Sequence, residues 1–284
     1  MIEVKDLQFT YPGAKQPTLK GLNFSIPAGE IFGFLGPSGA GKSTIQKILI
    51  GILKQYSGSV RVQGSEIRNS PSDYYEKIGV AFEFPNFYTR FTALENLSLF
   101  RSLYKGKTED PKHLLAMVDL DKYAHTKISD FSKGMKMRLN FCRALLGSPD
   151  ILFLDEPTSG LDPVNAKVMK DLILARQQQG TTILLTTHHM SAADELCDRV
   201  AFIVNGGISL IDSPRELKVR NGRSRVQIEY TDRGQLQRRD FDLQQIGSNQ
   251  AFLQLLRTHP IETMHTQEAT LEDVFIQVTG ESLR

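Results

Sequence analysis

The stretch GPSGAGKST, residues Gly36–Thr44, follows an apolar, strand-like run and precedes a helix-like stretch that begins at Lys42. It matches the phosphate-loop pattern G-x-x-x-x-G-K-[ST] in the strand-then-helix context that this pattern requires. Its three glycines let the backbone curl so that N–H groups converge on phosphate oxygens at a helix N-terminus. Lys42 can then reach the β- and γ-phosphates of a nucleotide, and the Ser43 hydroxyl can bind Mg²⁺. We therefore predict a nucleoside triphosphate site here, rather than a glycine-rich turn with a chance lysine.

A second motif, ILFLDEP, ends in an adjacent acidic pair, Asp155 and Glu156. Asp155 follows a buried strand and is placed to hold the ligand shell of a magnesium ion. Glu156 can polarise an attacking water as a general base, a role worth roughly 10²–10⁴ in rate. An acidic pair can also simply begin a loop. The phosphate loop upstream and the PTSGLD that follows favour the catalytic interpretation.

Composition excludes several classes of protein. Hydrophobic residues make up 40% and charged residues 23% of the 284, which excludes disordered and fibrous chains. A net charge of +2 is too small to indicate a nucleic-acid or anionic-membrane partner. No apolar run reaches the roughly 18–20 residues of a membrane span, and the first residues have no apolar signal core. Cys142 and Cys197 are expected to be small core residues in a reducing compartment, with a disulfide or a reactive thiol as the alternative.

The order of apolar patterns predicts an α/β fold. β-rich runs open the chain, and the pattern is mostly helical from about Phe84 to Gly147. Two continuously apolar strands, DILFLD and TTILLTT, follow on either side of a helix over roughly 163–179. Such strands alternating with helices indicate a sheet that is buried on both faces. RVAFIVNGGISLI then predicts a hairpin that turns at 205–207.

The composition changes after SPRELK, where Ser213 can cap a helix and Pro214 can occupy its first position. The polar, basic stretch VRNGRSR predicts a linker. RVQIEY predicts a strand, and NQAFLQLLRTH and ATLEDVFIQVTG predict two helices. The last helix has a capping box of Thr270 and Asp273 and can end at Gly280. We therefore predict one domain over residues 1–220 and a small α+β accessory domain over 221–284.

Taken together, the motifs resemble the nucleotide-binding subunit of an ABC transporter over residues 1 to about 220. The resemblance implies a P-loop NTPase fold with a RecA-like core, an antiparallel β subdomain and a helical subdomain at about 84–147. It implies ATP and Mg²⁺ as cofactors. It also implies that Tyr11, in FTYPG, stacks on adenine, although a tyrosine at a strand end can be an ordinary surface residue. The implied ATP-binding residues are Tyr11, Gly36, Pro37, Ser38, Gly39, Ala40, Gly41, Lys42, Ser43 and Thr44.

The family's signature loop reads LSGGQ, and the matching stretch here is FSKGM. Ser132 and Gly134 are kept, whereas Lys133 and Met135 replace a glycine and the glutamine. By the resemblance, Ser132, Gly134 and the Asp162 of SGLDP act on ATP that the partner subunit holds. Two half-sites completed across a two-fold axis imply a dimer, and a second copy of this chain is the expected partner. An ordinary N-capped helix is the alternative interpretation of FSKGM.

A carboxylate stands at the family's glutamine-bearing switch loop. The family pattern xxxQxPxL aligns with IGVAFEFPNFY so that Glu83 takes the position of the glutamine, whose oxygen joins the magnesium shell. The expected metal ligands are therefore Ser43, Glu83 and Asp155, since a carboxylate is a harder oxygen ligand than an amide. The alternative is a solvated Glu83, with Phe84 or a water in its role.

TTHHM contains two histidines. Alignment on the downstream ELCDRVA places His188, rather than His189, at the family's γ-phosphate-sensing position, and the swapped assignment is the alternative. The resemblance thus implies Glu156 and His188 as the catalytic pair.

The resemblance also implies a surface for a membrane subunit. In the family, the groove beside the switch loop receives a helix of that subunit. Phe84, Phe87 and Phe91 could form an apolar seat for the helix or could belong to the core of the helical subdomain.

The resemblance implies a cytoplasmic ATPase, peripheral on the inner face of the cell membrane through a separate multi-span permease. ATLEDVFIQVTG is similar to the ending of exporter-type subunits, which handle drugs, antibiotics, polysaccharides or lipids. No nucleic-acid partner is expected. One alternative is a soluble ABC ATPase in DNA repair or translation. The other is a non-hydrolysing regulatory module, which the departures at Glu83, Lys133 and Met135 leave open.

Overall fold

The computed structural model describes residues 1–221, 225–267 and 269–281. Its contacts divide the chain into two units, of which the first covers Met1–Ile211 and the second begins at Asp212. The domain boundary that the sequence predicts after residue 220 stays a prediction. The predicted linker includes residues 222–224, which lie outside the described residues. Within the described ranges, no helix has both the length and the apolar character needed to cross a bilayer.

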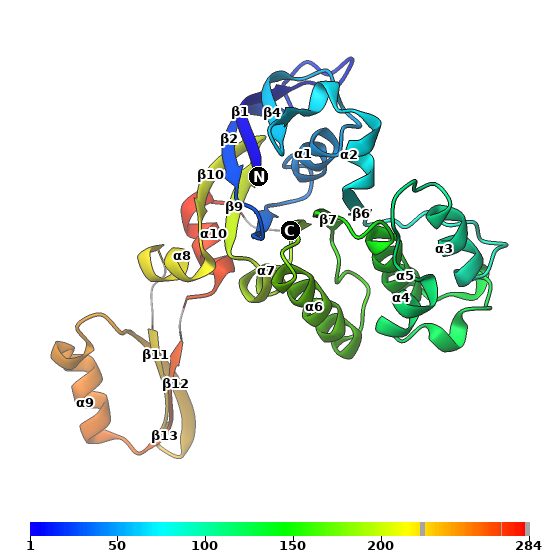
Figure 1. Ribbon diagram of the computed structural model, residues 1–284. Coiled ribbons are helices and arrows are strands. Elements are labelled where there is room, and N and C mark those ends of the chain that lie inside the picture. Colours follow the sequence, from blue (N-terminus) through cyan, green and yellow to red (C-terminus); the bar gives the residue numbers. More distant parts are fainter. Residues whose placement is uncertain (222–224, 268, 282–284) are drawn as a thin grey trace. The chain divides into compact units, whose positions relative to one another are not determined.

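A six-stranded sheet forms the centre of the first unit (Figure 1). In spatial order its strands are β10 (Gly207–Asp212), β9 (Arg199–Val204), β3 (Ile31–Leu35), β8 (Thr182–Thr187), β7 (Ile151–Asp155) and β6 (Ile78–Ala81). From β9 to β6 every neighbouring pair runs parallel. β3 and β8 are buried along their whole length, as strands covered on both faces must be. The continuously apolar runs thus confirm the predicted α/β class.

β9 and β10 form the hairpin that the Asn-Gly-Gly sequence predicts. Asn205 and Gly206 have φ values of 50° and 79°, and two successive positive φ angles are what a type I′ turn requires. Gly206 has a second constraint, because a Cβ there would lie 2.2 Å from the carbonyl oxygen of Thr18.

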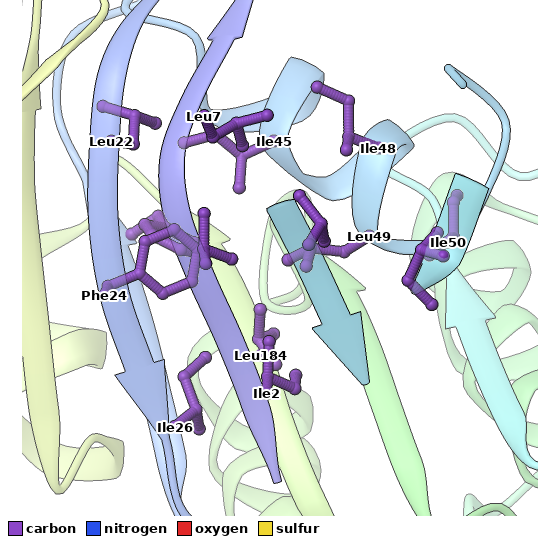
Figure 2. Close-up of a cluster of buried hydrophobic side chains, with 14 of the residues drawn as sticks. Ile2, Leu7, Leu22, Phe24, Ile26, Ile45, Ile48, Leu49, Ile50 and Leu184 are labelled. Carbon is purple, nitrogen blue, oxygen red and sulfur yellow. The ribbon is translucent and has the colours of Figure 1, made fainter. Parts of the chain in front are cut away.

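A four-stranded antiparallel sheet forms the second sheet of the first unit. Its spatial order is β2 (Leu19–Ile26), β1 (Ile2–Phe9), β4 (Ser57–Val62) and β5 (Ser65–Glu66). Four apolar residues of β1 are buried and join the helix α1 (Lys42–Leu49) in one apolar cluster, which also contains Phe32 and Phe34 of β3. Figure 2 shows Leu7 of β1 beside Ile45 of α1. The helix that follows the phosphate loop is therefore held in the core between the sheets.

The chain from β6 to β7 is mostly helical, where the sequence predicts the helical subdomain. Its helices are α3 (Ala93–Arg101), α4 (Pro111–Met117) and α5 (Lys133–Leu145), with short 3₁₀ turns at Asp121–Tyr123 and Ile128–Asp130. These three helices contact one another and gather beside β6 (Figure 1). Before β6, a 3₁₀ turn (Ile67–Asn69) and α2 (Ser72–Glu76) connect the two sheets, and after β7 come α6 (Pro163–Gln178) and α7 (Met190–Leu196).

β6 can approach α5 closely because Gly79 has no side chain. A Cβ at Gly79 would lie 2.0 Å from the carbonyl oxygen of Ala144 and 2.7 Å from a methyl carbon of Leu152. We expect Gly79→Ala to lower the free energy of unfolding by about 1–3 kcal/mol, because backbone atoms must move to admit the methyl group. Urea unfolding measures the change. Gly207→Ala is the control, since a Cβ there meets Val204 O at an ordinary 3.7 Å. Equal effects of the two substitutions would contradict the packing account.

The second unit is α+β, as predicted. An antiparallel sheet has the order β12 (Gln235–Asp242), β11 (Arg225–Asp232) and β13 (Ile261–Gln267), and the helices are α8 (Pro214–Asn221), α9 (Gln250–Thr258) and α10 (Leu271–Thr279). A short 3₁₀ turn, Ile246–Ser248, precedes α9. Val226 and Ile228 of β11 pack against Phe252 of α9. Helix α10 has the predicted Thr270–Asp273 capping box and ends at Gly280 with φ 70°, which confirms both end signals.

The two cysteines are buried and free, as the core interpretation predicts. Burial raises the pKa of both the Cys142 and the Cys197 thiol. A raised pKa keeps a thiol protonated and therefore unreactive.

Candidate active site

A cleft of about 560 Å³ lies at the carboxyl ends of β3, β7 and β8, the edge where open α/β sheets bind ligands. Eleven of its twelve lining residues are residues that the sequence analysis singles out. The lining is Tyr11, Thr18, Ser38, Gly39, Gly41, Lys42, Ser43, Thr44, Glu83, Asp155, Glu156 and His188. Segments more than 170 residues apart in the chain therefore meet in one cleft.

The phosphate loop joins β3 to α1, and its glycines are required by close contacts. A Cβ at Gly36 would lie 2.1 Å from the carbonyl oxygen of Ile203, and Gly41 has φ 112°. Lys42 donates hydrogen bonds from Nζ to the carbonyl oxygens of Gly36 (2.6 Å) and Pro37 (2.9 Å). The ammonium group thus lies over the loop whose N–H groups would cradle a phosphate.

Electrostatics link Lys42 to the acidic side of the cleft. Burial lowers the pKa of Lys42, and the carboxylates of Glu156, Asp155 and Glu83 act in the opposite direction. Burial also raises the pKa of Asp155, which a hydrogen bond from the Thr186 hydroxyl opposes. The Lys42 ammonium therefore faces three carboxylates across the cleft. The ammonium suits negatively charged phosphate groups, and the carboxylates suit a metal ion bound with them.

Glu156 is buried at 6% exposure and is held in one orientation. Its Oε2 accepts a hydrogen bond from Thr187 Oγ1 (2.9 Å), and its Oε1 accepts one from the backbone N–H of His188 (2.9 Å). His188 Nδ1 lies 2.6 Å from the same Oε1. Glu156 also has φ 49°, a left-handed conformation that is uncommon outside glycine and concentrates at functional sites. The carboxylate is thus fixed in position, as a general base must be.

The two histidines have different positions. His188 lines the cleft and contacts Glu156, whereas His189 lies against the His188 ring, with centroids 4.1 Å apart and the rings tilted by 37°. Of the two histidines, His188 therefore lines the cleft, and its assignment to the γ-phosphate stays a prediction.

Three oxygen-bearing side chains in the cleft suit a magnesium ion. The Ser43 hydroxyl and the carboxylates of Glu83 and Asp155 all line it. Oxygen ligands from a few carboxylates, completed by phosphate oxygens, are what Mg²⁺ takes in nucleotide sites. The donor set of this chain therefore fits the ion.

Tyr11 lies at the edge of the same cleft. Its hydroxyl is 3.2 Å from Thr44 Oγ1, and its ring meets Phe9 edge-on with centroids 4.8 Å apart. These contacts fix the ring next to the phosphate loop. Thr18 is the one lining residue that sequence reasoning misses. It precedes an ordinary strand, and nothing in QPTLKG distinguishes it from other polar residues.

Gly36, Pro37 and Ala40 do not line the cleft but support the phosphate loop. The carbonyl groups of Gly36 and Pro37 hold Lys42, and Ala40 is buried in the apolar cluster beneath the loop.

Ser132, Gly134 and Asp162 lie together at another place. Ser132 caps α5 by accepting a hydrogen bond from the N–H of Met135 (3.2 Å), and Asp162 caps α6. A Cβ at Gly134 would lie 3.5 Å from the carbonyl oxygen of Gly160, so FSKGM packs against SGLD. The structure therefore brings these predicted residues together, outside the cleft that this chain's own phosphate loop forms.

A groove of about 780 Å³ lies beside the loop that carries Glu83. Its lining is mainly apolar and includes Ile52, Phe84 and Leu103, which are 58%, 77% and 72% exposed. Phe87 instead packs against Phe100 (centroids 6.3 Å), and Phe91 packs against Tyr88 (5.5 Å). Of the three phenylalanines that the sequence singles out, Phe84 lines the groove.

Comparison with known proteins extends over both units. Residues 19–159 match the family model described as ABC transporter, and residues 224–268 match the fluoroquinolone efflux ABC transporter C-terminal domain. The chain is 52% identical over 284 residues to a fluoroquinolones export ATP-binding protein of Mycobacterium tuberculosis (strain CDC 1551 / Oshkosh), covering 100% of this chain and 94% of that one. It is 35% identical over 284 residues to the Nod factor export ATP-binding protein I of Burkholderia pseudomallei (strain 1710b), covering 93% and 92%.

Among solved structures, the chain resembles a dimeric, post-hydrolysis state of an ATP-binding cassette bound to ADP and phosphate. The TM-score is 0.68 at 26% identity, and the likeness covers 75% of this chain and 98% of that one.

Proposed function

Because this chain belongs to the ABC transporter family as an ATPase that powers export, we propose that it expels a fluoroquinolone-type compound through a separate membrane subunit. The observation that carries the substrate class is the 52% identity, over the whole chain, to a protein described as a fluoroquinolones export ATP-binding protein. The match of residues 224–268 to a C-terminal domain described for fluoroquinolone efflux agrees with it. The relatives do not favour a soluble ATPase of DNA repair or translation, or a non-hydrolysing module.

The geometry around Glu156 supports its role as general base. A water between Glu156 and the γ-phosphate would attack phosphorus as its proton passes to the carboxylate, and ADP would leave with the bond electrons. Thr187 and His188 hold the carboxylate in place for this transfer. With Nδ1 of His188 against Glu156, its Nε2 would contact the γ-phosphate, and Lys42 would offset the charge that develops there.

Ser43, Glu83 and Asp155 are proposed to hold Mg²⁺ in the cleft. When bound, the ion would supply positive charge that neutralises part of the phosphate charge. Tyr11, beside the phosphate loop, would stack on the adenine through the flat face of its ring.

Glu83→Gln should keep ATPase activity but require about 5- to 10-fold more Mg²⁺ for half-maximal rate, because an amide retains the oxygen ligand and loses the charge. A magnesium titration of the ATPase measures the shift. Glu3→Gln makes the same change at an exposed position of β1 and should leave the titration unchanged. Identical titrations for wild type and Glu83→Gln would contradict the ligand role.

As a member of this family, the chain is expected to work as a dimer. We propose that Ser132, Gly134 and Asp162 act on ATP that a second copy of this chain holds. Their position against one another, outside this chain's own cleft, supports the proposal. The dimeric state of the similar cassette structure agrees with it.

The apolar groove beside Phe84 is proposed to receive a helix of the membrane subunit, which would place this chain on the inner face of the cell membrane. Its exposed apolar side chains support the proposal, since patches of this kind mark interaction surfaces.

Transport into inside-out vesicles tests the proposed function. Vesicles from cells that contain the chain and its membrane subunit should accumulate a radiolabelled fluoroquinolone when ATP is added. Vesicles that carry Glu156→Gln should not accumulate it. Intact ATPase activity without drug accumulation would overturn the substrate class.

A further inference from the structure

The loop Phe82–Asn86 separates the nucleotide cleft from the apolar groove. Glu83 lines the cleft, and its neighbour Phe84 lines the groove. Because the two residues are adjacent, any movement of this loop shifts the Glu83 carboxylate. The contacts that hold the loop therefore decide where that carboxylate lies.

Helix α5 holds this loop at two points, one on each side of Glu83. Asn140, which is fully buried, donates a hydrogen bond from Nδ2 to the carbonyl oxygen of Phe82 (2.7 Å). Arg143, one turn further along, donates from one guanidinium nitrogen to the carbonyl oxygen of Asn86 (2.9 Å). The carbonyl groups just before and three residues after Glu83 are thus both tied to one rigid helix.

The two α5 side chains also fix each other. Arg143 donates from its second guanidinium nitrogen to Asn140 Oδ1 (2.6 Å), which sets the orientation of the amide so that Nδ2 faces Phe82. The Arg143 guanidinium lies over the rings of Phe87 (5.0 Å) and Phe100 (5.1 Å). Arg143 also lines the apolar groove, so the Asn140–Arg143 pair contacts both the groove and the loop.

Burying polar side chains costs free energy, which hydrogen bonds must offset. A buried polar network whose hydrogen bonds are satisfied holds its parts in one conformation. Here the hydrogen bonds reach backbone carbonyls on either side of a proposed metal ligand. Partners that orient a ligand from behind typically change metal affinity by about 10- to 100-fold when they are removed.

We propose that Asn140 and Arg143 are positioning residues for Glu83, which hold its carboxylate at the distance that the magnesium ion requires. This inference rests on the proposed magnesium role of Glu83. It also connects α5, which Ser132 caps and whose first turn contains Gly134, to the metal side of the cleft through direct hydrogen bonds.

The test compares substitutions of the same type at two buried asparagines. Asn140→Asp keeps size and the contact to Arg143 but removes the donor to Phe82. Asn96 is also fully buried, and it donates to the carbonyl oxygens of Tyr88 (3.1 Å) and Thr92 (2.9 Å), further along the same segment. Asn96→Asp therefore makes a similar perturbation of stability at a place that does not flank Glu83.

The readout is direct metal binding by the full-length chain. Electron paramagnetic resonance measures the affinity for Mn²⁺ in the presence of a non-hydrolysable ATP analogue, and analogue binding in EDTA provides the metal-free reference. Asn140→Asp should bind Mn²⁺ about 10-fold more weakly with analogue binding in EDTA unchanged. Asn96→Asp should keep the wild-type Mn²⁺ affinity. Arg143→Lys, which keeps the charge but loses the paired hydrogen bonds, should weaken Mn²⁺ in the same direction and serves if Asn140→Asp does not fold.

Glu83→Gln, measured alongside, separates this inference from the proposed function. Weaker Mn²⁺ binding by Glu83→Gln, with wild-type binding by Asn140→Asp and Arg143→Lys, would overturn the positioning role and leave the metal role of Glu83 intact. Equal weakening by Asn96→Asp and Asn140→Asp would also overturn it, because the effect would then be general destabilisation. Unchanged Mn²⁺ binding by Glu83→Gln would remove the metal role and this inference with it.

Discussion

Glu156→Gln should abolish steady-state ATP hydrolysis, with a fall of about 10²- to 10⁴-fold, while ATP still binds. The amide has the shape of the carboxylate. Its oxygen can still accept the hydrogen bond from the His188 backbone N–H, and its NH2 group can donate to the Thr187 hydroxyl oxygen. It cannot take a proton from water at neutral pH. The loss should therefore fall on the chemical step and not on nucleotide binding.

Two measurements separate these steps. Phosphate release measures turnover, and the fluorescence of a labelled ATP analogue measures binding. Glu195→Gln is the matched control, because Glu195 lies on α7, is 58% exposed and pairs with Lys170. It should turn over ATP at the wild-type rate. Substantial hydrolysis by Glu156→Gln would show that another group activates the water, and the assignment of the base would then be wrong.

Lys42→Ala should weaken ATP binding about 100-fold, equivalent to about 2.7 kcal/mol, and should reduce hydrolysis with it. Lys42 is the cation that the cleft places against three carboxylates and over the phosphate loop. Without it, phosphate charge would meet Asp155, Glu156 and Glu83 with no ammonium between them.

The affinity for ATP, measured by calorimetry in the presence of Mg²⁺, checks this expectation. Lys54→Ala removes a charge of the same sign from an exposed position just beyond α1 and should leave the affinity unchanged. Unfolding by urea should be followed for both variants, so that loss of binding is not confused with loss of fold. A Lys42→Ala variant that binds ATP as the wild type does would contradict the proposed phosphate contacts.

Local sequence signals predict the parts of the fold that depend on neighbours in the chain. The Asn205-Gly206 turn and the Thr270–Asp273 capping box are short-range features, and the structure has both. Continuous apolar runs predict the buried strands β7 and β8, because both faces of a parallel sheet are covered.

Two strands of the second unit escape such reasoning. β12 reads QLQRRDFD and is exposed at every position except Phe241, and β13 has no buried residue in its span. They form strands because β11, with buried Val226 and Ile228, offers both of its edges for pairing. Pairing of this kind depends on a partner strand, which outweighs weak intrinsic preference.

At the site, contacts between segments that are distant in the chain also could not be predicted from the sequence. The phosphate loop predicts its own geometry, but nothing in RLNFCRAL indicates that Asn140 reaches back to the carbonyl of Phe82. The apolar groove likewise joins Ile52, Phe84 and Leu103 from three separate segments. Thr18, just before β2, is held close to Tyr11 by a hydrogen bond from its backbone N–H to the carbonyl oxygen of Phe9 (2.8 Å), and it belongs to no sequence motif.

The central claim is that hydrolysis in this cleft drives a membrane partner, and affinity capture of the chain from detergent-solubilised membranes of its native host tests it most directly. The experiment uses both the wild type and Glu156→Gln, with ATP present to hold the closed dimer. We expect a multi-span membrane protein to co-purify in stoichiometric amount with both forms, and to sustain ATP turnover only with the wild type. Recovery of the chain from the soluble fraction alone, without a membrane protein, would contradict the account.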